Sequence, residues 1–153
     1  MRILQVVPRL SLKHGSDGVV IALSLAKDLA KRKHKVGIFT SDYELTKKDI
    51  SDLQVDNHIW VFPFKTILNI ASMHITQIPI KKITPIFIDS DDSGVDVAHM
   101  QSCRTFQSIV VRFYCKMFRV PYVVDAHGFS KEGTGIRRLF QIVFDACFGN
   151  RIV

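Results

Sequence analysis

The sequence predicts an α/β protein with a Rossmann-like, doubly wound parallel sheet that carries helices on both faces. Two observations support this prediction. Short apolar segments alternate along the chain with longer amphipathic ones, and the short segments are apolar throughout instead of alternating with polar residues. A strand of that kind is buried on both sides, as in a parallel sheet with helices above and below it. The length of 153 residues corresponds to one domain, residues 1–153.

The first half of the chain supplies three strands and one clear helix. Residues 2–8 form an apolar segment that is typical of a buried strand, and further strands are expected at 35–40 and at 59–62, where Pro63 ends the pairing. A loop rich in turn formers leads to the helix. Its apolar face recurs at steps of three and four residues and consists of Val19, Ala22, Leu23, Ala26, Leu29 and Ala30.

The second half begins with residues 65–94, where two prolines favour short helices and loops. Strands follow at 95–99 and 121–126, on either side of a helix at 104–118, and a last helix begins near residue 134. The buried stripe expected for the helix at 104–118 consists of Phe106, Ile109, Val110, Phe113 and Met117.

Composition narrows the class of protein without choosing a function. The net charge of +7 favours negatively charged partners, which include nucleic acid, an anionic membrane face and phosphorylated substrates. Three scattered cysteines fit neither a disulfide framework nor a zinc motif, and we expect buried, reduced thiols in a cytoplasmic protein. We expect no transmembrane helix, because no stretch of about 18 residues is apolar and uncharged.

Ligands of doubly wound sheets bind outside the carboxyl ends of the strands. Three loops are expected there, at residues 14–18, 99–104 and 127–131. Glycines in the first loop would let a ligand approach the backbone, and the amides at the start of the next helix favour negative charge. His99 ends one buried strand and His127 follows another, and at such positions a histidine can bind a substrate hydroxyl or serve as a structural hydrogen-bonding group.

Four stretches together resemble the N-terminal domain of family 4 glycosyltransferases of the two-domain GT-B type. They are LAKDLAKRKHKV at 25–36, VDVAHM at 95–100, RTFQ at 104–107 and VPYVVDAHG at 120–128, which is the most specific of the four. The sequence departs from the family pattern in the glycines of the first loop, in Lys33 for a glycine, and in Gln101 for a second histidine.

The resemblance implies a role for individual residues. His127 would be catalytic, looking toward the transferred sugar and stabilising charge on the departing phosphate. The residues expected to bind substrate are Gly15, Ser16, Gly18, His99, Arg104 and Gly128.

The resemblance also implies the reaction and its partners. The enzyme would move a sugar from a nucleotide sugar to a glycan or lipid-linked acceptor, with retention of configuration, without a metal and without a further cofactor. Residues 1–153 would form the acceptor-side domain, which we expect to be incomplete. A C-terminal donor-binding domain would act with it in cis or in trans. The positive charge either holds the protein at the inner face of an anionic membrane or is distributed for solubility.

The main alternative to a glycosyltransferase domain is a non-catalytic subunit that binds an acceptor or a partner chain. A basic nucleic-acid-binding domain is disfavoured, because the sequence lacks strands with interleaved aromatic and basic residues. The Asp89-Ser90-Asp91 sequence matches a metal-binding Asp-x-Asp, but it precedes a turn into a strand, which favours a solvated acidic turn. No Gly-x-Gly-x-x-Gly follows the first strand, which argues against a dinucleotide site.

Overall fold

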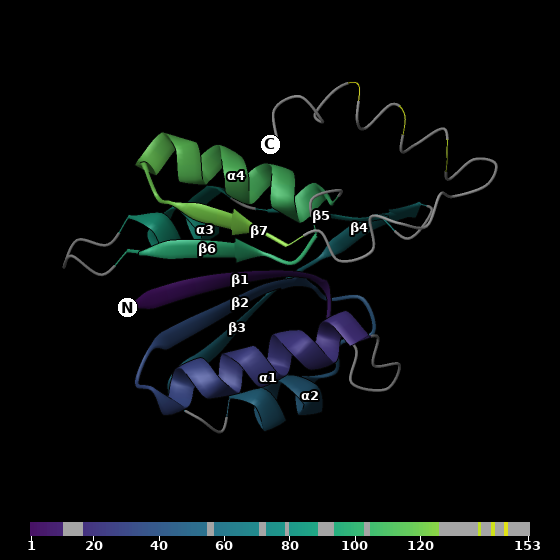
Figure 1. Ribbon diagram of the computed structural model, residues 1–153. Coiled ribbons are helices and arrows are strands. Elements are labelled where there is room, and N and C mark those ends of the chain that lie inside the picture. The colour runs from purple at the N-terminus through teal and green to yellow at the C-terminus, as the bar shows by residue number, and fades with distance from the viewer. Residues whose placement is uncertain are drawn as a thin grey trace.

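The computed structural model describes residues 1–10, 17–54, 57–70, 73–78, 80–88, 94–102 and 105–125, together with residues 138, 142 and 146. Strands alternate with helices through most of these residues, as Figure 1 shows. The elements are β1 (Arg2–Arg9), α1 (Asp17–Lys31), β2 (Lys35–Ser41), α2 (Lys47–Leu53), β3 (Ile59–Phe64), β4 (Thr66–Ile70), β5 (Met73–Thr76), α3 (Ile80–Phe87), β6 (Val97–Met100), α4 (Phe106–Phe118) and β7 (Tyr122–Val124).

The main sheet confirms the predicted fold class. Its strands lie in the order β3-β2-β1-β6-β7, and every neighbouring pair is parallel. The order reverses between β1 and β6, because the chain first builds the sheet outward to β3 and then returns to the other side of β1. In Figure 1, α1 and α2 lie on one face of the sheet, and α3 and α4 lie on the other.

Each face of the sheet has its own apolar core, and alternate strand residues contribute to each. On β2, Val36 and Ile38 pack in the cluster that includes α1, whereas Phe39 packs in the cluster that includes α4. On β1, Leu4 and Val6 belong to the α4 cluster. This two-sided burial explains why the strands are apolar throughout.

Helix α1 has the predicted buried face, and α4 does not. Val19, Ala22, Ala26 and Ala30 of α1 are buried, with Leu23 and Leu29 packed beside them. On α4 the buried residues are Gln107, Ser108, Val111, Tyr114 and Cys115. The predicted stripe was wrong for Phe113, which is 59% exposed, and for Met117, which is 54% exposed, whereas Val110 packs against the α4 cluster. Helix α4 carries apolar residues on more than one side, so their spacing alone does not identify the face that packs on the sheet.

The segment at 65–94 contains a strand pair that was not predicted. β4 and β5 form an antiparallel hairpin, and β5 contacts α4, β1 and β2. Helix α3 follows and includes Pro85, in agreement with the short helices expected in this segment. The prediction for Pro63 was wrong, because β3 continues to Phe64. Pro63 lies on the outermost strand, where its missing N–H can face away from β2.

The remaining boundaries differ by a few residues. β6 begins at Val97 and α4 at Phe106, slightly later than predicted. Cys115 is a free, buried thiol, as expected. Cys103, Cys147 and most of the predicted last helix lie outside the described residues.

Candidate functional site

The candidate site lies where the strand order reverses, at the carboxyl ends of β1 and β6. These strands are parallel neighbours, and the helices that follow them, α1 and α4, cover opposite faces of the sheet. Helices that diverge in this way leave room between the two loops that leave the sheet, which is why doubly wound sheets bind ligands at such a point. Two of the predicted site residues, Gly18 and His99, belong to described segments that border it.

Gly18 lies in the first turn of α1, which begins at Asp17. No neighbouring atom of the described residues lies within 4 Å of a Cβ added at Gly18. Packing against this part of the chain therefore does not require glycine here, and it leaves the space beside the backbone open. The first amides of a helix carry partial positive charge, so this open position is suited to a phosphate group.

His99 lies on β6 and is half-buried. Its neighbours Ala98 and Met100 pack into the α4 cluster, so the imidazole belongs to the face that α1 covers. Its Cα partners are Gln5 on β1 and Val123 on β7. Val123 is 57% exposed, so the α1 face is only partly covered on this side of the sheet. The imidazole can therefore take part in binding from an accessible side of the sheet.

Two buried amides accompany His99. Gln5 is fully buried, and neither its Nε2 nor its Oε1 has a hydrogen-bond partner among the described residues. Gln101, the residue after β6, is 6% exposed, and its Nε2 also lacks a partner in this part of the chain. Buried polar groups are normally satisfied, and exceptions are concentrated where a ligand or water completes the bonding. A polar residue in the apolar 2–8 segment was the available signal for Gln5.

Arg9 is a further cation at this edge that the sequence analysis did not select. It is the last residue of β1, and its guanidinium forms an ion pair with Glu44, in the segment after β2. The same guanidinium lies 5.4 Å from the ring centroid of Tyr43. These contacts hold the segment after β2 against the end of β1. The signal in the sequence was a basic residue directly after the apolar segment at residues 2–8.

The start of α4 is capped by the protein itself. The Thr105 hydroxyl accepts a hydrogen bond from the Ser108 amide at 3.2 Å, and the Ser108 hydroxyl donates to the Ser102 carbonyl. An amide that is already bonded to a cap is not available to an anion. Anion binding at the point where the strand order reverses therefore depends on α1 and β6 more than on α4.

The remaining predicted site residues belong to other segments of the chain. Gly15, Ser16, Arg104, His127 and Gly128 lie outside the described residues, as does the Asp89-Ser90-Asp91 sequence. The strand that leads toward His127 is described. The N–H of Asp125, after β7, donates to the carbonyl of Met100 at 2.7 Å, so this strand stays paired to β6 up to its end.

Two further observations concern the described part of the chain alone. No group of three or more His, Cys, Asp or Glu side chains within it is close enough to hold a metal ion. None of its helices has the length and apolar character needed to cross a membrane. Comparison with known proteins adds no assignment, since no family model and no curated protein matches the chain.

Proposed function

We propose that the chain is the acceptor-side, N-terminal domain of a retaining, metal-independent glycosyltransferase. Its substrates are a nucleotide sugar and a glycan or lipid-linked acceptor. The proposal rests on the four sequence stretches that resemble GT-B family 4 enzymes and on the parallel, doubly wound sheet. The observation that carries it is the position of His99 at the reversal of strand order, beside the buried amides of Gln5 and Gln101. Among the described residues, the Gln5 amide has no hydrogen-bond partner and the Gln101 Nε2 has none.

The residues of the proposed site have different roles in the transfer. The open backbone at Gly18 and the first amides of α1 attract the phosphates of the donor. His99 exchanges a hydrogen bond with a hydroxyl of the acceptor, because an imidazole can both donate and accept. His127 stabilises the negative charge that develops on the departing phosphate. The donor-binding domain, in cis or in trans, presents the sugar, and transfer requires groups from both sides.

The first experiment asks whether activity depends on the second domain. The 153-residue chain alone is expected to give no turnover with any nucleotide sugar, whereas joining or coexpressing a donor-binding domain restores transfer. Turnover by the chain alone would contradict the proposed division of roles. Binding of acceptor without turnover in either form would favour the alternative of a non-catalytic binding subunit.

The second experiment concerns His127. In the two-domain enzyme, His127→Ala is expected to lower kcat by about a hundredfold, the scale for one lost electrostatic donor, with little change in Tm. His34→Ala is the control, since His34 follows α1 at the opposite edge of the sheet from the candidate site. Normal turnover together with a large loss of stability in His127→Ala would show that this histidine is structural.

A further inference from the structure

A hollow lies at the other end of the sheet, near the amino ends of its strands. It is a pocket of about 430 Å³, a size that suits a small molecule, and it opens on the face that α3 and α4 cover. Arg2 and Lys35, two of its lining residues, are the first residues of β1 and β2. The pocket is therefore separate from the candidate site, which lies at the carboxyl ends of the strands.

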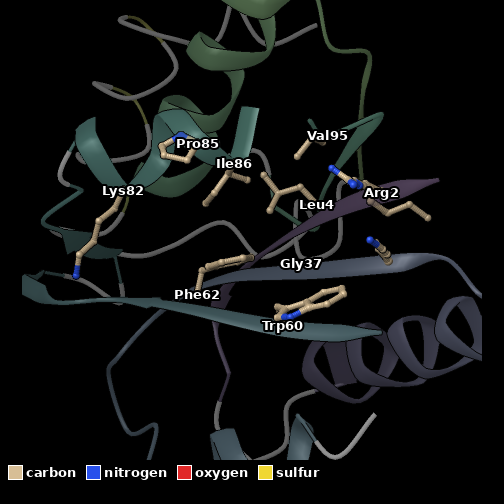
Figure 2. A pocket seen from close by; sticks show the side chains of 11 residues that line it. Arg2, Leu4, Gly37, Trp60, Phe62, Lys82, Pro85, Ile86 and Val95 are labelled. Carbon is tan, nitrogen blue, oxygen red and sulfur yellow. The ribbon is translucent and has the colours of Figure 1, made fainter. Parts of the chain in front are cut away.

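The register of three strands creates this hollow. Gly37 of β2 is the Cα partner of Leu4 on β1 and of Trp60 on β3, so the middle position has no side chain. The Phe62 ring leans over the glycine, and a Cβ there would lie 2.9 Å from its Cε2 atom. Helix α3 has only eight residues and covers the floor in part. Figure 2 shows Pro85 and Ile86 of α3 on the side opposite Trp60.

The walls are apolar and the rim is cationic. Trp60 is 39% exposed, and the remaining apolar lining includes Ile3, Leu4, Phe62 and Ile86. Arg2 and Lys82 lie toward opposite ends of the pocket in Figure 2. Lys35 is the Cα partner of Arg2, so two cationic residues begin neighbouring strands at one end. Asp96 accepts a hydrogen bond from the Arg2 backbone N–H at 2.6 Å.

We propose that this amino-edge pocket binds a single-chain anionic amphiphile. The alkyl chain lies along Trp60, Phe62 and Ile86, and the carboxylate or phosphate head lies at the end marked by Lys35. An apolar cavity alone would accept many ligands, but the exposed lysines at its rim select a negative head. The inference stands independently of the proposed glycosyltransferase function, because it uses none of the residues at the carboxyl edge.

The chain contains a direct probe of this pocket. Trp60 is the single tryptophan of the sequence, so the intrinsic tryptophan emission reports this site alone. Titration with 12-bromododecanoate, below the concentration at which it aggregates, is expected to quench the emission saturably, since bromine quenches at contact. The shorter 11-bromoundecanoate should bind about fourfold more weakly, the factor for one buried methylene. The neutral 12-bromododecanol should bind more weakly than the carboxylate.

Charge variants test the head position. Lys35→Gln is expected to weaken binding of 12-bromododecanoate by about two- to fivefold, the range for one exposed charge pair. Lys48→Gln is the matched control and should leave it unchanged, because Lys48 is an exposed lysine on α2, on the other face of the sheet. Circular dichroism confirms that each variant is folded.

Three outcomes would overturn the proposal, and the first two use the unaltered chain. The first is quenching that never saturates or that occurs only with aggregates or vesicles, which would indicate adsorption to a lipid surface. The second is equal affinity for the carboxylate and the alcohol, which would remove the charge selection. The third is an equal loss of affinity in Lys35→Gln and Lys48→Gln.

Discussion

Gln5 on β1 and His99 on β6 are Cα partners in the parallel sheet, and both belong to the face that α1 covers. Gln5 is fully buried, and its amide group has no hydrogen-bond partner among the described residues. A buried, unsatisfied polar group costs stability, and proteins retain such costs mainly at functional positions. The buried Gln5 amide therefore lowers the stability of the sheet at a position next to the candidate site.

The first prediction concerns this cost. Gln5→Met keeps the side-chain volume and removes the unsatisfied amide, so the free energy of unfolding is expected to rise by about 1–3 kcal/mol. Urea denaturation measures the change. Gln77→Met, at an exposed position, is the control and should have an effect near zero. A clear loss of stability in Gln5→Met would mean that the amide is satisfied in solution.

The second prediction concerns the floor of the amino-edge pocket. Gly37→Ala places a Cβ against the Phe62 ring and is expected to lower the free energy of unfolding by about 1–3 kcal/mol, the usual cost of overpacking. In a chain that carries Phe62→Leu, the same substitution should cost less, because the ring atoms it meets are gone. A double-mutant cycle measures the coupling. Strictly additive effects would contradict the close approach of Phe62 to Gly37.

The third prediction concerns the buried thiol. Burial raises the pKa of Cys115 from 9.0 to about 12, so the folded chain keeps this proton where the unfolded chain loses it. The contribution of Cys115 to stability is therefore complete below pH 9 and is lost as the pH rises toward about 12. In a Cys103→Ser/Cys147→Ser chain, a thiol reagent at pH 8 should label Cys115 only after denaturation. Rapid labelling of the native chain would refute its burial.

The fourth prediction concerns the basic amino edge of the sheet. Helices end and strands begin at this edge, and the cationic residues there include Arg2, Arg32, Lys33, Lys35 and Arg119. The chain is expected to sediment with anionic vesicles and not with neutral ones, at about 1 kcal/mol per cation near the surface. Salt should weaken the binding.

Matched variants distinguish vesicle binding through this edge from vesicle binding through the net positive charge of the whole chain. Lys33→Gln/Arg119→Gln should reduce vesicle binding, whereas Lys47→Gln/Lys48→Gln, at the start of α2 and hence at the carboxyl edge, should not. Equal, salt-independent sedimentation with both vesicle types would remove the membrane as a partner. Tight, salt-sensitive binding to oligonucleotides would favour the nucleic-acid interpretation.

The parallel sheet and α1 were predictable because each depends on a local pattern. Strands such as 35–40 are apolar on both sides, and α1 is apolar on one face only. The buried face of α4 was not predictable, since Phe113 and Tyr114 are both aromatic and only packing on the sheet decides that Tyr114 is buried. The β4-β5 hairpin was not predicted, because its strands are short and because the two prolines of this segment, Pro79 and Pro85, favoured short helices and loops instead.

The candidate site was predictable only in outline. The predicted end of the strand at 95–99 placed His99 near the carboxyl edge of the sheet. In a parallel sheet, the topology alone decides which loops lie at that edge. The buried amide of Gln5, which has no partner in the described part of the chain, and the ion pair of Arg9 with Glu44 depend on how distant segments pack together. The amino-edge pocket depends on the alignment of Leu4, Gly37 and Trp60 across three strands, which no local pattern contains.

The most direct test of the central claim is a two-dimensional ¹⁵N–¹H NMR titration of the labelled chain with UDP-glucose and GDP-mannose. The account predicts saturable amide shifts at Gly18, His99 and Gln101 with at least one nucleotide sugar, weakened in His99→Ala. Gly37 and Trp60, at the amino-edge pocket, should not shift. Shifts confined to Gly37 and Trp60, or no saturable shift at the carboxyl edge with either nucleotide sugar, would contradict the account.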